Sequence, residues 1–308
     1  KTIFYHRNNI KPNEKLTGPA IIIEPTSTIV VEPGWDATLK DSNDLLLTRT
    51  QKIIRSSAIG TSVDPIMLEI FNNLFMSVAE QMGMVLENTA SSVNIKERLD
   101  FSCALFSPTG DLVANAPHVP VHLGSMSESI KTIIRENSAT MKPGDAFLIN
   151  APYNGGTHLP DITLIKPVFD DNNENVIFYV ATRGHHADIG GTVPGSAPAD
   201  STHIKEEGVL IDNFTIVAKG VFLEKEIYKL LSSGEHPARN IKQNIADLKA
   251  QVAAAEKGSQ ELMKIIKHYG LEVVHAYMSH VQDNAEESVR RVLDVLRDSS
   301  FTYKMDDG

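Results

Sequence analysis

A row of apolar residues spaced four apart constrains the fold more than any other feature of this 308-residue sequence. The row follows Asp64 and Pro65, and Asp is a good N-cap residue while Pro is tolerated in the first helical turn. Residues four apart share one side of an α-helix. The pattern therefore predicts a long helix from Asp64 and Pro65 to about Glu87, with one face in a core. The row comprises Ile66, Ile70, Leu74, Val78, Met82 and Leu86.

Three stretches of different composition predict the domain organisation. Residues 1–50 alternate short apolar runs with turns, which is typical of a small β structure. Residues 51–63 are small and polar without periodicity, so we predict a linker there. Residues 64–308 carry longer helical and strand patterns and predict a larger second module. The strands expected in the first stretch are 20–23, 28–31 and 45–48.

The second module is predicted to be an α+β structure. After the long helix in the sequence we expect mixed β structure with glycine-rich loops, and a short amphipathic helix over 125–137. Two helical patterns joined at Gly270 predict a C-terminal helical hairpin over 241–269 and 271–296. The expected strands are 101–106, 112–114, 146–150, 163–168, 176–182 and 214–218.

Composition argues against several functional classes. The chain has 29 Lys and Arg against 39 Asp and Glu, a net charge of −10, and no long basic run, so we expect no nucleic-acid partner. Cys103 is the single cysteine, which excludes an intramolecular disulfide and a thiolate metal cluster. The lack of disulfides favours a location in the cytoplasm, namely the cytosol. The longest apolar stretches fall far short of the roughly 20 residues of a membrane helix, so we expect no membrane span.

Two glycine-rich segments contain the residues best suited to chemistry. The loop GGTHLPD contains His158 and Asp161, and the segment RGHHADIGG contains His185 and His186. If the strands beside them pair as a hairpin, His158, Asp161 and one histidine of the adjacent pair form a site of two imidazoles and one carboxylate. Such donors suit Zn, Mn or Fe(II) and leave positions open for water or substrate. The alternative is that these histidines only hydrogen-bond nearby backbone groups.

A proline-containing segment offers two more histidines. Pro117 and Pro120 restrain residues 115–125, which we predict to be an extended strip that carries His118 and His122. These imidazoles can contact a substrate or a metal. The alternative is that this segment has only a structural role and that its imidazoles form hydrogen bonds within the protein.

Several long motifs resemble the hydantoinase B module of the ATP-dependent 5-oxoprolinase family. They are DPI at 64–66, NIKERLDFSC at 94–103, HVPVHLG at 118–124, GGTHLPD at 155–161 and RGHHADIGG at 183–191. Near the N-terminus, GPAIIIE at 18–24 and STIVV at 27–31 resemble the C-terminal tail of the hydantoinase A module. A chain that carries both resembles the fused members of the family. It also begins without Met, so we expect an internal fragment of a longer protein.

The resemblance implies an enzyme that hydrolyses 5-oxo-L-proline to L-glutamate with ATP cleavage, in the γ-glutamyl cycle of glutathione turnover. It implies that the rest of the A module binds ATP with Mg, so we expect no nucleotide-binding residues in this chain. Relatives such as acetone carboxylase hold a metal in the B module on His, Asp and His. This implies a divalent Mn, Zn or Fe ion on His158, Asp161 and His185, with His186 as the alternative to His185.

The resemblance also suggests how the reaction divides between the modules. Phosphorylation of the lactam oxygen creates a better leaving group, and water activated by the B-module metal then attacks, with Asp188 or His186 as catalytic base. His118 and His122 are the candidate substrate contacts. We expect the remaining parts of the A and B modules as partners, a homodimer, and no activity from this chain alone.

Two other kinds of function fit the same sequence. The chain can belong to an ATP-dependent hydantoinase or to a ketone carboxylase, whose relatives usually keep the A and B modules as separate subunits. It can also be a non-catalytic assembly scaffold, with the helical hairpin at an interface and the loop histidines bonded to the backbone.

Overall fold

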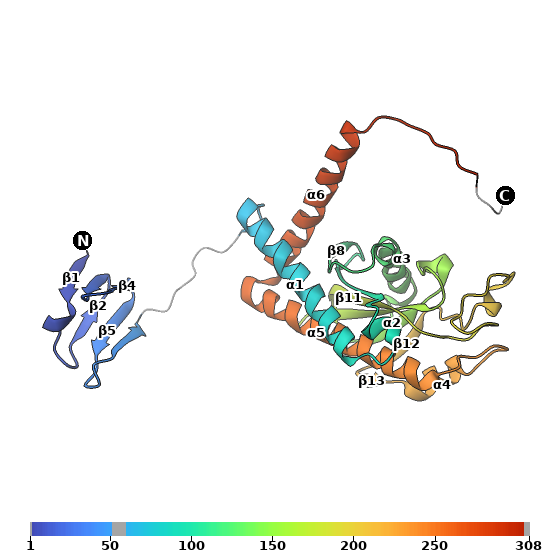
Figure 1. Ribbon diagram of the computed structural model, residues 1–308, viewed down its shortest axis with the longest axis horizontal. Coiled ribbons are helices and arrows are strands. Elements are labelled where there is room, and N and C mark those ends of the chain that lie inside the picture. The colour runs from blue at the N-terminus through green and yellow to red at the C-terminus, as the bar shows by residue number, and fades with distance from the viewer. Residues whose placement is uncertain (1, 51–59, 305–308) are drawn as a thin grey trace. The chain divides into compact units, whose positions relative to one another are not determined.

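The chain forms two compact units, Lys1–Ala58 and Ile59–Gly308, in a computed structural model that describes residues 2–50 and 60–304 (Figure 1). Helices and a largely separate set of strands make up the fold, which confirms the predicted α+β class. The linker predicted over 51–63 lies mostly outside the described residues, because 51–59 are not among them.

The first unit consists of short strands, all within residues 2–50. Their bounds are β1 Ile3–His6, β2 Lys15–Thr17, β3 Ala20–Ile23, β4 Thr28–Val31, β5 Trp35–Leu39 and β6 Leu45–Arg49, with a 3₁₀ turn at Arg7–Asn9. One sheet has the order β1-β3-β4 and the other β2-β5-β6. Leu16, Ile22 and Val31 belong to the small core of this unit. The three strands predicted in this stretch are confirmed.

The second unit is organised around one antiparallel sheet. Its strands are β7 Phe101–Phe106, β8 Leu112–Asn115, β9 Ala146–Ile149, β10 Asp161–Phe169, β11 Val176–His185, β12 Phe214–Ala218 and β13 Val221–Phe222. Within residues 60–304 they follow the order β13-β12-β9-β10-β11-β7-β8. The two longest strands, β10 and β11, lie near the centre and form the hairpin on which the site suggested by the sequence depends.

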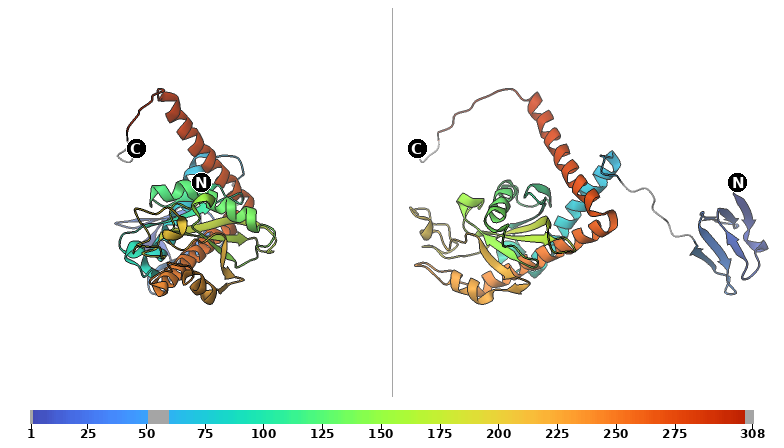
Figure 2. Two further views of the ribbon diagram at one scale, coloured as in Figure 1. Left: turned by 90° about the vertical axis from the view of Figure 1, so that its right-hand side faces the viewer. Right: turned by 180° about the vertical axis from the view of Figure 1, so that it is seen from behind.

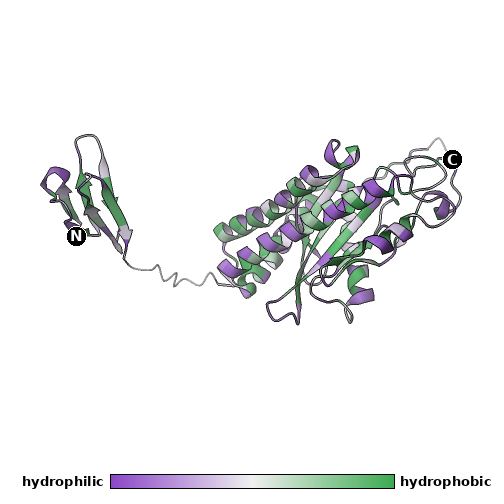
Figure 3. Cartoon of the chain, turned by 90° about the horizontal axis from the view of Figure 1, so that it is seen from below, coloured by the Kyte–Doolittle hydropathy of each residue, from purple (hydrophilic) through white to green (hydrophobic). Residues whose placement is uncertain are grey.

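Helices cover both faces of this sheet. Their bounds are α1 Pro65–Thr89, α2 Val93–Lys96, α3 Pro120–Asn137, α4 Glu224–Leu231, α5 Ile241–Tyr269 and α6 Leu271–Val295, with 3₁₀ turns at Pro152–Asn154 and Ile204–Glu206. Helices α1 and α5 pack on one face and α3 on the other (Figure 1). Because both faces are buried, the central strands are apolar along most of their length. They are mostly green in Figure 3.

Only part of the apolar row predicted for α1 faces the core. Asp64 caps the helix as predicted, since its side chain accepts a backbone N–H of the first turn at 2.8 Å. Ile66, however, is 73% exposed and Ile70 is exposed as well, while Phe71 and Phe75 are buried. The prediction was therefore wrong for Ile66 and Ile70. A strict spacing of four residues drifts around a helix with 3.6 residues per turn, so the row leaves the core-facing side.

Helix α3 begins at Pro120 rather than at Ser125. Pro120 fits the first helical turn, where the N–H that it lacks has no intrahelical partner. The extended strip predicted over 115–125 is therefore wrong in its second half. This places His122 in the first turn of a helix.

The predicted C-terminal helical hairpin is confirmed. Helices α5 and α6 meet at Gly270, whose φ of 89° lies in the left-handed region that glycine tolerates. Both helices pack against α1, and the second half of α6 projects away from the sheet (Figure 2). Among the described residues, none of the helices is both long enough and apolar enough to cross a membrane.

Candidate metal centre

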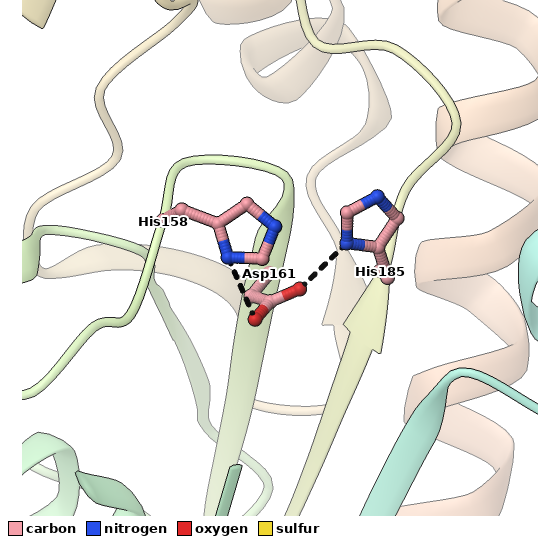
Figure 4. Close-up of side chains that lie close together, drawn as sticks. All are labelled: His158, Asp161 and His185. Carbon is pink, nitrogen blue, oxygen red and sulfur yellow. Dashed lines mark hydrogen bonds and ion pairs between the residues drawn. The ribbon is translucent and has the colours of Figure 1, made fainter. Parts of the chain in front are cut away.

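The candidate centre lies where β10 begins and β11 ends. Asp161 stands directly opposite His185 in this hairpin, and the turn before β10 brings His158 back to the same carboxylate (Figure 4). Gly155 in that turn has a φ of 91°, and a Cβ there would collide with the α3 backbone at Ser129. The glycine thus lets the turn approach α3 closely. The structure brings together the three residues named as candidate ligands.

Asp161 is the buried centre of this cluster. It is 0% exposed, its Oδ1 lies 2.9 Å from His185 Nδ1, and its Oδ2 lies 3.1 Å from His158 Nδ1. One ligand atom from each residue lies within 4.8 Å of the others. The His158 side chain is 51% exposed, which leaves one side of the cluster accessible. Two imidazole nitrogens and a carboxylate oxygen are donors that fit Zn, Mn or Fe(II).

The surrounding donors keep Asp161 ionised. Burial by itself raises the pKa of Asp161, but hydrogen bonds from three histidines and Thr157 outweigh it and hold the pKa far below the usual value of a carboxyl group. The hydrogen bond to Asp161 in turn raises the pKa of His158. Asp161 is therefore an anion at neutral pH, which is the form that binds metals.

This pKa shift predicts how the stability of the metal-free chain depends on pH. Because folding lowers the pKa of Asp161, its ionisation stabilises the folded state above the unfolded pKa, and this contribution is lost as the pH falls toward the folded pKa. We expect the urea midpoint of the wild type to fall more steeply below about pH 5 than that of Asp161→Asn. Asp294→Asn, an exposed change in α6, should behave like the wild type. Equal slopes for wild type and Asp161→Asn would contradict the prediction.

The two adjacent histidines are the last residue of β11 and the residue after it, and they point to opposite sides of the sheet. His185 shares the side of Asp161. His186 is buried against α5, with its Nε2 3.1 Å from Gln251 Oε1 and its Nδ1 3.2 Å from Asn244 Nδ2. The structure therefore places His185 in the cluster, and the geometry supports His186 neither as the alternative ligand nor as the catalytic base.

Asp188, the other candidate base, shapes a loop. Its Oδ1 accepts the backbone N–H groups of Gly190 and Arg239, and its Oδ2 accepts the Gly195 N–H and the Arg239 guanidinium. These four donors engage both carboxylate oxygens. The geometry of Asp188 thus indicates a structural role rather than the predicted proton transfer.

The two histidines named as substrate contacts point into the protein. His118 Nδ1 accepts the Cys103 N–H at 3.1 Å and its ring packs on Phe101, which matches the structural alternative. His122 is 2% exposed, and its Nε2 lies 3.2 Å from Asp161 Oδ2. His122 therefore joins the cluster from α3. Burial raises the pKa of the Cys103 thiol, which is consistent with an unreactive thiol.

Arg183 supports the cluster, although sequence reasoning did not single it out. Its side chain is wholly buried, on the same side of the sheet as His185 and Asp161. Its positive charge acts on Asp161 and offsets the buried negative charge. The sequence feature that could have identified Arg183 is a charged residue two positions before His185 in an otherwise apolar strand. The guanidinium donates five hydrogen bonds, to Thr163 Oγ1, Ser125 Oγ, Ser129 Oγ and the carbonyl oxygens of His122 and Gly155.

Fold and cluster together define an α+β domain with a candidate metal centre of two histidines and one aspartate. Residues 64–308 match the family model described as Hydantoinase B/oxoprolinase. The chain belongs to this family.

Comparison with individual proteins gives the same family. The 5-oxoprolinase of Dictyostelium discoideum is 48% identical over 306 residues, which are 99% of this chain and 23% of that protein. 5-oxoprolinase 1 of Arabidopsis thaliana is 46% identical over 301 residues, 95% of this chain and 24% of that protein. The chain thus spans about a quarter of the length of these relatives. The crystal structure of the ATP-dependent caprolactamase from Pseudomonas jessenii is similar, with a TM-score of 0.69 and 29% identity over 77% of this chain and 40% of that chain.

Proposed function

We propose that this chain is the part of an ATP-dependent 5-oxoprolinase that carries a metal-assisted hydrolysis site. The complete enzyme would convert 5-oxo-L-proline to L-glutamate with ATP cleavage. The observation that carries the proposal is the buried Asp161 between His158 and His185. Two relatives named 5-oxoprolinase and a structural neighbour named caprolactamase support a cyclic amide as substrate.

The residues of the cluster explain how the chain would serve this reaction. His158, Asp161 and His185 would hold a divalent Mn, Zn or Fe ion, which supplies Lewis-acid chemistry and lowers the pKa of water. The donors around Asp161 keep its carboxylate ionised, which is the form that binds a metal, and Arg183 offsets the charge. The half-exposed His158 leaves one side open toward substrate.

The nucleotide step belongs to another part of the complete enzyme in this proposal. Residues 1–50 would be the C-terminal tail of a hydantoinase A-like module and 64–308 the N-terminal part of a hydantoinase B-like module. ATP with Mg would bind the remainder of the A module and phosphorylate the lactam oxygen, because an amide is a poor electrophile. We place this enzyme in cytosolic glutathione metabolism. Light scattering would test the homodimer that we expect.

Metal content tests the proposal directly. We expect elemental mass spectrometry to find about one equivalent of Mn, Zn or Fe in the wild-type chain and less than about a tenth in His158→Ala and His185→Ala, because each variant lacks one of three protein ligands. His6→Ala, which changes an exposed histidine of the first unit, should retain the metal. A wild type without metal, or both site variants with full metal content, would overturn the proposal.

A further inference from the structure

The second half of helix α6 has the sequence pattern of a helix with one buried side, yet it is exposed all round. All residues from 283 to 304 are exposed, and this part of α6 projects away from the sheet (Figure 2). Ala285, Val289 and Val292 are spaced four and three residues apart, which places them on one side of the helix. We call these three residues the α6 stripe. Val289 and Val292 are 59% and 57% exposed, and Leu296 directly after the helix is 63% exposed.

The α6 stripe continues the row by which the first half of α6 packs on the rest of the unit. Val274, Met278 and Val281 are buried there, with spacings of four and three residues. Ala285 follows Val281 after four residues, so the buried row and the stripe lie on the same side of one helix. Single apolar residues are normal on a protein surface, but a continuous row of them marks a contact surface.

The other side of this half of α6 is charged. Arg290 forms an ion pair with Glu286 at 2.5 Å, and Arg291 forms one with Glu287 at 2.7 Å, each across one helical turn. Asp294 lies seven residues after Glu287 and therefore on the same charged side. A helix surrounded by water has no need for such a division, whereas a helix that packs against another structure does. The pattern therefore indicates that the α6 stripe is covered in the complete protein.

A groove of about 640 Å³ lies beside the start of the stripe. It is lined by the first half of α1, by β8 and by α6, and Val281 and Ala285 are among its α6 residues. The Gln282 side chain donates to the Leu112 carbonyl oxygen at 2.9 Å and so fixes α6 beside β8. Strand β8 is the last strand of the sheet over residues 60–304, so its outer edge has no strand partner there. Groove and stripe form one continuous surface, because they share Ala285.

We propose that the remaining part of the hydantoinase B-like module packs on the α6 stripe and on the groove. The length of a relative supports this occupant, since the match covers 40% of the caprolactamase chain and leaves the larger part of that chain unmatched. In the module assignment proposed above, the remaining part follows α6 in the sequence. A segment attached to α6 reaches the surface of α6 at a high effective concentration. The inference rests on that assignment and does not depend on the metal centre.

Thiol labelling followed by peptide mass spectrometry tests this inference. Val292→Cys places a thiol on the stripe, and Asp294→Cys, on the charged side of the same helix, is the matched control. Cys103 is wholly buried, so the introduced thiol is the reactive one in the 308-residue chain. We expect the two variants to react within about threefold of each other in this chain. In the complete protein Val292→Cys should react at least about tenfold more slowly than Asp294→Cys, because labelling then requires local opening.

The outcomes distinguish the possible occupants of the stripe. Equal labelling of the two variants in the complete protein would overturn the inference, because the stripe would then be uncovered. Protection of Val292→Cys in the 308-residue chain itself would also overturn it, and protection that is lost on dilution would identify a second copy as the occupant. Metal content is measured separately, so failure of the proposed metal centre leaves this test unaffected.

A charge on the stripe gives a second, independent measurement. Val292→Glu should leave the urea midpoint of the 308-residue chain unchanged and lower that of the complete protein, because it places a charge in a packed contact. Asp294→Glu keeps the charge at an exposed position and should leave both midpoints unchanged. An unchanged midpoint of the complete protein in Val292→Glu would contradict the inference.

Discussion

Replacing Asp161 with asparagine is expected to reduce glutamate formation by at least about 10³-fold in the complete enzyme, while part of the ATP cleavage persists. A neutral amide is a poorer metal ligand than a carboxylate, and the factor corresponds to about 4 kcal/mol of lost transition-state stabilisation. ATP cleavage should persist because we place the nucleotide in a different module. The measurement is glutamate and phosphate release determined in the same reaction mixture.

Asp294→Asn is the matched control for this experiment. It makes the same chemical change at an exposed position of α6, and both activities should remain. Unchanged glutamate formation in Asp161→Asn would contradict a catalytic metal at this cluster. An equal loss of glutamate formation and ATP cleavage would instead show that the two steps depend on one site, which contradicts the proposed division between modules.

Arg183→Met is expected to lower the free energy of unfolding of the second unit by about 3–5 kcal/mol. The substitution removes five hydrogen bonds and leaves the carbonyl oxygens of His122 and Gly155 unpaired in a buried place. It also leaves the charge of Asp161 without its cationic neighbour. Far-UV circular dichroism during urea unfolding measures the effect, because the described α-helices all lie in the second unit.

The first unit provides an internal control for this measurement. Trp35 is the single tryptophan and lies in that unit, so its fluorescence should report an unchanged transition. Arg135→Met, whose side chain is 61% exposed in the wild type, should cost less than about 0.5 kcal/mol. Arg183→Lys should lie in between, because an ammonium group cannot reproduce the planar fork of five donors. An unchanged midpoint for Arg183→Met would refute the role assigned to this residue.

Long and strongly patterned elements could be predicted from the sequence. The helices over Pro65–Thr89 and Ile241–Tyr269 were expected with nearly these bounds, because their caps and apolar spacing are local features. Strand β5, Trp35–Leu39, was missed although its residues WDATL alternate between apolar and polar, because a pattern of five residues is short. Short strands depend on their partners more than on their own composition.

The orientation of α1 could not be predicted from its own residues. Spacing shows which side chains share a side of a helix but not which side another element covers. Phe71 turns inward because Tyr269 and Tyr277 pack on its ring, with ring centroids 4.9 Å and 4.4 Å away. Both tyrosines lie about two hundred positions further along the sequence. The exposed Ile66 and Ile70 follow from this contact.

The sequence by itself determined the chemistry that the cluster can offer and the hairpin that assembles it. Imidazole and carboxylate groups lie at the ends of two apolar strands. The antiparallel pairing of these strands places Asp161 directly opposite His185. Only the tertiary structure decided which neighbouring residues join them. Helix α3 covers the side of the sheet that carries Asp161 and supplies His122, while α5 covers the other side and buries His186. Such choices depend on packing between distant segments, and local spacing contains no information about which helix covers which face.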